Sequence, residues 1–251
     1  MAKSRNKYIV KRNRRRLILK IIFFVFVLIG SFVAFACKSD FFIIKKVAIL
    51  GNPVRSGDEV KEKTEYLLGQ NILFIDKSHI VEEAKKNPYV KSVKIKKSYP
   101  KLVNITVTEK KAVYYIQEDK NVYVLSNDLV ILENNADIKN RNLVKLSGIK
   151  ISGKNIGDKA VSEERMYNIL DLFAQMIIVN PTNYKIDSID LSDLTNIKVY
   201  IGQIEGRLGN DEKLTNKMNE LLHIIEDQSI GIKKGYIDVG FDGNPVYYKE
   251  E

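Results

Sequence analysis

The strongest hydrophobic pattern in the chain is an apolar run that follows a basic N-terminal segment. Residues 21–37 carry no charged side chain, and residues 17–19 extend the run backwards if Lys20 directs its ammonium group to lipid headgroups. Residues 17–37 would form about 31 Å of helix, which spans a bilayer core of about 30 Å. The pattern predicts a transmembrane helix over residues 17–37, with the anchoring side chains Lys20, Ile21, Phe24, Leu28, Phe32 and Cys37.

Two other interpretations of this run stay open. Ala34-Phe35-Ala36 matches the A-x-A pattern of signal-peptidase cleavage, and Cys37 directly after it would be the acylated residue of a lipoprotein. Cleavage is disfavoured because the run exceeds the roughly 7–15 apolar residues of a signal peptide. Acylation is disfavoured because Phe35 is bulky where a lipoprotein signal has small residues. We expect a retained anchor, which the mass of the mature N-terminus tests.

Beyond the apolar run, the pattern predicts a small α+β domain over residues 41–111. The predicted elements are a strand at residues 43–50, a helix opened by a capping box of Ser56 and Glu59, a helix capped by Asp76 or Ser78, and strands at residues 90–95 and 103–107. The order β-α-α-β-β favours two helices on one face of a sheet.

Residues 112–251 predict a second, mixed β-rich domain with two helices, so the fold class is α+β. Strands are expected at residues 113–116, 122–125, 129–132, 143–146, 186–191, 197–201 and 204–208. One helix begins near Ser162 and ends at Asn180-Pro181, and the other carries Leu214, Met218 and Leu221 on one face. We interpret the Leu and Met stripes of both helices as core. Residues 235–241 and 245–248 predict a terminal hairpin at a sheet edge.

Formal charge is concentrated at the start of the chain. The sequence carries +10, and residues 1–20 contain nine Lys and Arg but no Asp or Glu. Removing these nine from 41 leaves 32 Lys and Arg against 31 Asp and Glu, so the remainder is close to neutral at +1. The charge therefore predicts membrane topology and argues against a nucleic-acid partner. We expect a cytoplasmic tail over residues 1–20 and an extracytoplasmic remainder.

Residues capable of catalysis or metal binding form no convincing pattern. A single cysteine, Cys37, allows no intrachain disulfide. His79 and His223 lack neighbours at metal-ligand spacing. Ser98 and Lys101 match an S-x-x-K motif, but Pro100 between them prevents the helical turn that this chemistry requires. We expect a protein that is not an enzyme, with no cofactor, metal or small-molecule substrate.

Short motifs lie in order along both domains. In the first they are Phe42-Ile43-Ile44-Lys45-Lys46-Val47, Gly51-Asn52, Asn71-Ile72, Phe74, Asn87-Pro88-Tyr89-Val90, Tyr99-Pro100, Ile105, Val107, Glu109, Lys110 and Ala112. In the second they are Leu146, Gly148, Ile189, Leu191, Gly206-Arg207-Leu208-Gly209, Lys213-Leu214 and Ile237-Asp238-Val239-Gly240-Phe241.

These motifs, with the basic tail and spanning helix, resemble the bacterial FtsQ/DivIB cell-division family over nearly the whole chain. The first domain is similar to that family's POTRA module, although Tyr99 replaces Trp, Lys110 replaces Arg and Lys111 replaces Pro. The run at residues 237–241 is similar to the family's IDLRY sequence, with three substitutions at its end.

The resemblance implies a single-pass membrane protein that acts as a non-enzymatic divisome scaffold at the septum. Such proteins bind FtsL and FtsB/DivIC-type partners outside the membrane and help control septal peptidoglycan synthesis. Carried over, the partner-binding residues are Tyr236, Ile237, Asp238, Val239, Gly240, Phe241, Val246, Tyr247 and Tyr248. An edge strand suits this role because its unpaired backbone groups accept a partner strand. In the alternative interpretation, Tyr236 and Phe241 fill the core of an ordinary hairpin.

Two other function classes are distinguishable. A membrane-anchored POTRA component that handles unfolded polypeptides would precede a β-barrel, for which the chain is too short. A wall-active hydrolase or transferase would need a convergent polar pocket in residues 112–251, which no sequence motif supports. Turnover of peptidoglycan by the purified protein would favour the enzyme.

Overall fold

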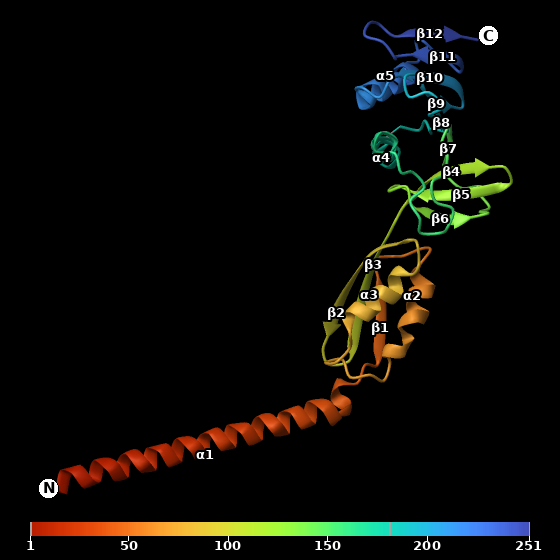
Figure 1. Cartoon of the computed structure of the whole chain (residues 1–251). Coiled ribbons are helices and arrows are strands. Elements are labelled where there is room, and N and C mark those ends of the chain that lie inside the picture. Colours follow the sequence, from red (N-terminus) through yellow and green to blue (C-terminus); the bar gives the residue numbers. More distant parts are fainter. Residues whose placement is uncertain (1, 181, 251) are drawn as a thin grey trace. The chain divides into compact units, whose positions relative to one another are not determined.

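The computed structural model describes residues 2–180 and 182–250, without the side chains of residues 2–10 and 13. Its first element is α1 (Ala2–Lys38), which contains both the basic segment and the apolar run (Figure 1). The segment Arg14–Lys38 is long and apolar enough to cross a membrane. Its apolar side chains other than Ala36 are exposed, with Phe24 at 63% and Phe32 at 67%. This fits the predicted single-pass anchor, because such a helix is surrounded by lipid.

The chain forms two compact units. The first comprises the residues up to Asn87 together with Ser92–Thr108, and the second comprises Pro88–Lys91 and the residues from Glu109 onward. The limits that the sequence predicts, 41–111 and 112–251, stay predictions. Met1, Glu251 and the helix-stopping Pro181, on which parts of those predictions fall, lie outside the described residues.

The first unit has the predicted order β-α-α-β-β. Its elements are η1 (Asp40–Phe42), β1 (Lys46–Leu50), α2 (Gly57–Thr64), η2 (Glu65–Leu67), α3 (Lys77–Lys85), β2 (Val90–Ser98) and β3 (Leu102–Glu109). The sheet order is β1-β3-β2, with β1 parallel to β3. Alternate residues of β3 (Val103, Ile105 and Val107) are buried, and the helices lie on one face of the sheet (Figure 1).

The two helix starts in this unit differ. Asp76 caps α3, because its Oδ1 accepts hydrogen bonds from the backbone N–H groups of Ser78 at 2.8 Å and His79 at 3.4 Å. The capping box expected at Ser56 is wrong: the residue has φ −109° and ψ −9°, and its side chain makes no cap hydrogen bond. A cap needs an extended backbone to turn its oxygen toward the first helical N–H groups. Glu59 instead pairs with Lys63.

The second unit is built on a nine-stranded sheet of order β12-β11-β10-β9-β8-β7-β4-β5-β6. The strands are β4 (Ala112–Glu118), β5 (Asn121–Ser126), β6 (Ile131–Asn134), β7 (Val144–Ser147), β8 (Ser188–Asp190), β9 (Ile197–Ile201), β10 (Gln203–Gly209), β11 (Lys234–Asp238) and β12 (Val246–Lys249). The pairs β7–β8 and β10–β11 run parallel, and the chain crosses between their members through α4 (Glu164–Val179) and α5 (Leu214–Glu226). Parallel neighbours need such crossovers.

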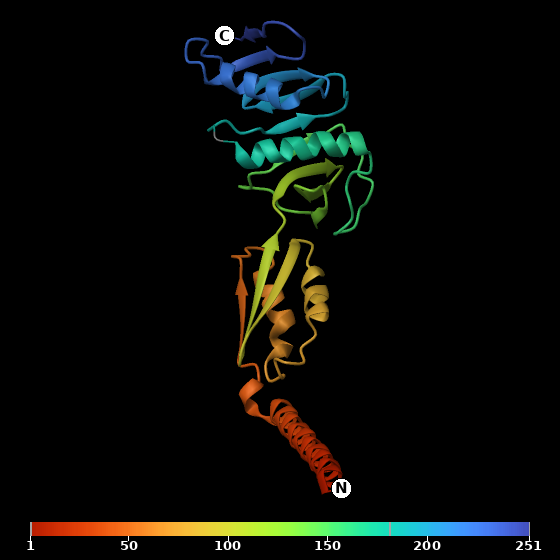
Figure 2. The same cartoon turned by 90° about the vertical axis from the view of Figure 1, so that its left-hand side faces the viewer.

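Both helices pack against one face of this sheet (Figure 2). Tyr114 of β4 is fully buried and donates its hydroxyl to the Leu170 carbonyl of α4 at 2.6 Å. On α5, Met218 and Leu221 are buried. A Cβ at Gly206 of β10 would collide with Leu221, so the glycine allows α5 to approach the sheet closely. The prediction that the helix stripes form core is confirmed.

Candidate partner-binding edge

β12 is the outermost strand of the sheet, and among the described residues only β11 pairs with it. The Glu250 N–H donates to the Lys234 carbonyl at 3.0 Å. Because backbone direction alternates along an antiparallel strand, Val246 and Tyr248 also direct their backbone groups toward β11. The N–H and C=O groups of Tyr247 and Lys249 therefore point away from β11, where a further strand can pair with them.

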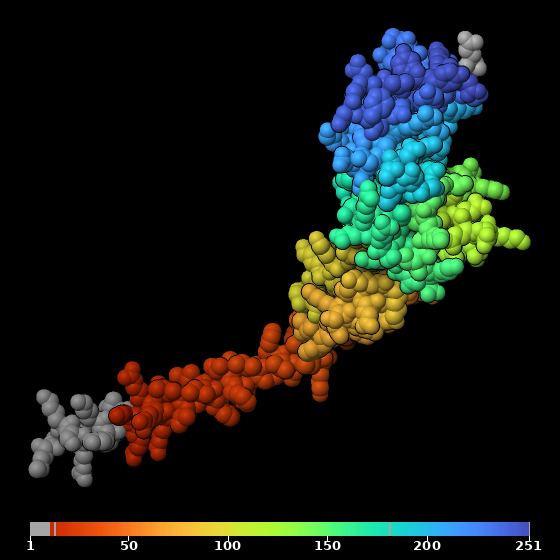
Figure 3. Space-filling model, turned by 45° about the horizontal axis from the view of Figure 1, so that its top comes forward, coloured from red at the N-terminus to blue at the C-terminus, as the bar shows by residue number. Residues whose placement is uncertain are grey.

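The side chains of β12 are exposed along its whole length. Val246 and Tyr247 are each 49% exposed and Tyr248 is 54% exposed. The C-terminal segment lies at the molecular surface in the space-filling view (Figure 3, dark blue). Edge strands of monomeric proteins are usually protected by charge, proline or a covering loop. β12 presents two tyrosines and a valine beside an open backbone edge, with Pro245 directly before it and Lys249 as its last residue.

An aromatic stack joins β12 to the strands behind it. The rings of Tyr236 and Tyr248, which are directly opposite in the register, are 5.8 Å apart at an interplanar angle of 24°. The guanidinium carbon of Arg207 lies 3.8 Å from the centroid of the Tyr236 ring. The three side chains lie on the sheet face opposite α5, because Gly206 and Ile237, which alternate with them, lie on the α5 side.

Glu205 orients Arg207 on this face. Its carboxylate lies 2.7 Å from Arg207 and 3.5 Å from Lys198, and it accepts a hydrogen bond from the Tyr200 hydroxyl at 3.5 Å. Burial opposes ionisation of Glu205, but the hydrogen bond from Arg207 and the charges of Lys198 and Arg207 outweigh it and lower the pKa of Glu205. The carboxylate stays charged at neutral pH and holds the guanidinium over Tyr236.

The predicted partner-binding residues fall into three groups. Val246, Tyr247, Tyr248 and the 49% exposed Phe241 are accessible, whereas Ile237 is fully buried and Val239 is 4% exposed. Tyr236, Asp238 and Gly240 are half-buried. The sequence predicts residues 236–241 as the docking edge itself. In the sheet this run belongs to β11 and the turn after it. β12 pairs along the outer side of β11, so β12 and not β11 forms the edge. The binding role of the nine residues stays a prediction.

Asp238 and Gly240 shape the turn that leads to β12. The Asp238 carboxylate accepts a hydrogen bond from the Gly240 N–H at 2.9 Å. A Cβ on Gly240 would lie 2.8 Å from the backbone nitrogen of Gly209, so only glycine allows these two backbone segments to approach. The packing against β10 therefore explains why residue 240 is glycine.

From the sequence, Arg207 was indicated only as part of a motif, and Lys198, Tyr200 and Glu205 were not predicted as site residues. Their shared face follows from the antiparallel register of β9 and β10, in which Tyr200 is opposite Glu205 and Lys198 is opposite Arg207. The alternating polar residues of both segments can be seen in the sequence, but the pairing of the two strands cannot.

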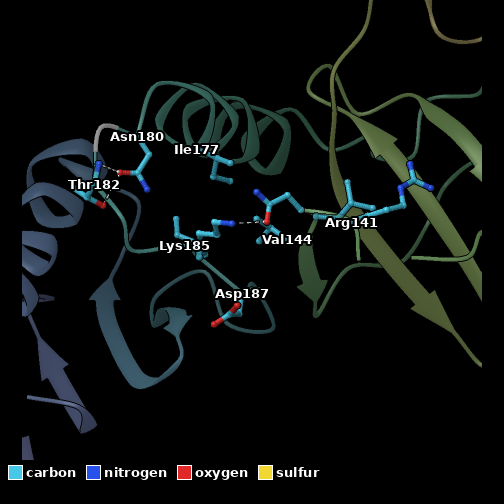
Figure 4. A pocket seen from close by; sticks show the side chains of 10 residues that line it. Arg141, Val144, Ile177, Asn180, Thr182, Lys185 and Asp187 are labelled. Atoms are coloured by element: carbon cyan, nitrogen blue, oxygen red, sulfur yellow. Dashed lines mark hydrogen bonds between the residues drawn. The ribbon is translucent and has the colours of Figure 1, made fainter. Parts of the chain in front are cut away.

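A cavity of about 290 Å³ lies elsewhere in the second unit, between the end of α4 and the segment before β8 (Figure 4). Its lining includes Arg141, Ile177, Asn180, Lys185 and Asp187. Lys185 donates to the Asn142 side chain at 3.1 Å. Among the described residues, no group of three or more His, Cys, Asp or Glu side chains is placed to hold a metal ion. The cavity therefore offers polar contacts but no arrangement that indicates a specific reaction.

Comparison with known proteins agrees with this architecture. Residues 42–110 match the POTRA domain, FtsQ-type, and residues 114–239 match the FtsQ/DivIB C-terminal domain of cell division proteins. The chain is 32% identical to the cell division protein DivIB of Clostridium acetobutylicum, with 98% of each chain covered. It is 31% identical to DivIB of Clostridium botulinum strain Hall, covering 99% of this chain and 98% of the relative. It is 22% identical to DivIB of Listeria monocytogenes over 92% of this chain and 83% of the relative. With its apolar N-terminal helix and both matched domains, the chain belongs to the FtsQ/DivIB family of cell division proteins.

Proposed function

We propose that this protein is a non-enzymatic scaffold of the division septum that binds FtsL and FtsB/DivIC-type partners outside the membrane. In this role it helps regulate septal peptidoglycan synthesis. The observation that carries the proposal is β12, an exposed terminal strand with an open backbone edge and large apolar side chains. A partner segment adds as a further strand beside Tyr247 and Lys249, while Tyr248 and Phe241 supply aromatic contacts.

The backbone edge is tested by Tyr247→Pro in the full chain. Proline removes the outward N–H of residue 247 but leaves the pairing of residues 246 and 248 with β11, as is tolerated on an edge strand. We expect Tyr247→Pro to lose recovery of FtsL and FtsB/DivIC-like proteins in co-purification from cross-linked membranes. Tyr247→Ala, which keeps the N–H, is the matched control and should retain part of the recovery. Equal recovery with Tyr247→Pro and the unaltered protein would rule out strand addition.

Side-chain contacts are tested by Phe241→Ala in the same membranes. Phe241 is 49% exposed, so its truncation should change the free energy of unfolding by less than about 0.5 kcal/mol. We expect weaker partner recovery with an unchanged unfolding transition. A chain stopped after Ile232, which lacks the whole hairpin, gives the background level of recovery. Full recovery with that shortened chain would place the binding site elsewhere.

A further inference from the structure

Segments that are distant in sequence meet in the first unit at the end of α1. The Asn71 side chain donates to the Ala36 carbonyl at 2.7 Å, which ties the segment before α3 to the last turns of the helix. The Ile72 N–H donates to the Phe42 carbonyl at 2.9 Å, and the Ile44 N–H donates to the Gln70 carbonyl at 2.8 Å. The segment after η2 therefore lies beside the residues that leave α1.

The turn between β2 and β3 joins the same end of the unit. The Lys45 N–H donates to the Lys101 carbonyl at 2.9 Å. Lys97 donates its ammonium group to the Leu73 carbonyl at 2.9 Å. These bonds gather residues 97–101 and 68–74 around the start of the chain's first globular unit, where it connects to the apolar helix.

Large apolar side chains project from this end into solvent. Phe41 is 51% exposed, Leu68 48%, Phe74 67% and Tyr99 59%. Each belongs to one of the loops that the hydrogen bonds bring together. Single exposed apolar residues are ordinary on a protein surface, whereas a group of this kind marks a contact surface. Phe41 also contacts Phe35 of α1 and Phe42, with ring centroids 6.5 Å and 5.1 Å apart.

The charged residues at this end are mostly cations. Lysines at positions 38, 45, 97 and 101 lie in these segments and Lys46 and Lys77 lie directly beside them in sequence, whereas the acids in or beside the segments are Asp40, Glu65 and Asp76, of which Asp76 is occupied in capping α3. Burial and the neighbouring charge of Lys77 lower the pKa of Lys97. An anionic surface would relieve this repulsion between lysines.

Any molecule that contacts this surface must lie beside the end of a membrane-spanning helix. Phe41 follows Lys38, the last residue of α1, by three positions, so the chain can separate them by no more than about 11 Å. Aromatic side chains and lysines together favour the headgroup layer of a bilayer, where rings contact acyl chains and ammonium groups contact phosphates. Continuity with α1 and this charge complementarity select lipid over another protein.

We propose that Phe41, Leu68, Phe74 and Tyr99, with the surrounding lysines, form a lipid-contact surface that rests the first unit on the membrane. The proposal depends on α1 spanning the bilayer and is independent of partner binding at β12. It makes the POTRA-type unit an interfacial module, held at the membrane surface by more than its covalent link to α1.

The sequence contains no tryptophan, so single substitutions give unique fluorescence probes of depth. Phe74→Trp and Tyr99→Trp are prepared in the full chain and reconstituted into phosphatidylcholine vesicles with phosphatidylglycerol. Lipids brominated near the headgroup should quench both probes at least roughly two-fold, because interfacial side chains lie about 5–10 Å into the headgroup and acyl boundary. The emission maxima should also shift to shorter wavelength relative to detergent-solubilised protein.

Val54→Trp is the matched control within the same unit. Val54 is 86% exposed and follows the opposite end of β1 from Lys45 and Lys46. Its probe should show water-like emission and no quenching by brominated lipid. Circular dichroism of all three variants establishes that they fold. Equal quenching of the probes at positions 54, 74 and 99 would overturn the proposal, as would the absence of quenching at both 74 and 99. Stronger quenching at 74 and 99 with phosphatidylglycerol than without it is expected if the lysines contribute.

Discussion

The nine-stranded sheet has two edges, which differ in how far other segments of the chain cover them. At β6, the Ile131 N–H donates to the Asp158 carbonyl at 2.9 Å, and the Ile131 carbonyl accepts from the Gly157 N–H at 2.8 Å. A loop therefore covers the Ile131 end of this edge, and Ile131 and Leu132 are buried. At β12, no described strand lies on the outer side, and every side chain is exposed. The same sheet can protect an edge, so the open β12 is a local feature and not a general property of the fold.

The largest expected difference between the two edges is the loss of stability that a proline substitution causes. Ile131→Pro removes the hydrogen bond to Asp158 and a fully buried side chain, and it should lower the free energy of unfolding by about 3 kcal/mol or more. Tyr247→Pro should cost less than about 1 kcal/mol, because the lost N–H faces outward. Denaturant unfolding of the full chain in detergent measures both. Similar losses would mean that the two edges are equally closed.

A smaller effect is expected from the stack that supports β12. Tyr248→Ala removes the ring that lies 5.8 Å from Tyr236 and should lower the free energy of unfolding by about 0.5–1.5 kcal/mol. Val246→Ala, on the same strand, is the comparison and should change it by less than about 0.5 kcal/mol. A double-mutant cycle with Tyr236→Ala isolates the stack. A coupling energy of zero would show that the rings contribute nothing to each other.

The smallest effect concerns acid stability on the face behind β12. The folded pKa of Glu205 is lowered from an ordinary value of 4.5, so its contribution is complete above about pH 4.5 and is lost as pH falls through the folded pKa. As the pH falls from neutral through the folded pKa, the unaltered chain should lose more unfolding free energy than Glu205→Gln. Parallel pH profiles for the two proteins would contradict a stabilising role for this carboxylate.

Periodicity was sufficient to predict most elements of both units. The alternation at residues 103–107 gave β3, and the apolar stripes of the second domain gave α4 and α5 as core helices. These signals are local, because each element must bury one face. The capping box at Ser56 failed because the motif specifies residue types and not the backbone angles that a cap requires.

The pairing of the strands could not be predicted from local sequence patterns in the same way. Nothing in the sequence of β11 indicates that it pairs in parallel with β10 on one side and with β12 on the other. This arrangement depends on the α5 crossover, a long-range feature. The position of Arg207 over Tyr236 follows from it, so the sequence could name the terminal hairpin but could not separate its buried strand from its exposed one.

The sheet order also determines how a mechanical load would travel through the molecule. A pull exerted on β12 and resisted at β4, where the chain enters the sheet, passes through the intervening ladders in series. A series of links yields at its weakest member, and β8 (Ser188–Asp190) is the shortest strand on that route at three residues. Ile189 in its centre is fully buried, so packing reinforces the strand where hydrogen bonds are fewest. Under such a load, the ladders of this short central strand would separate first.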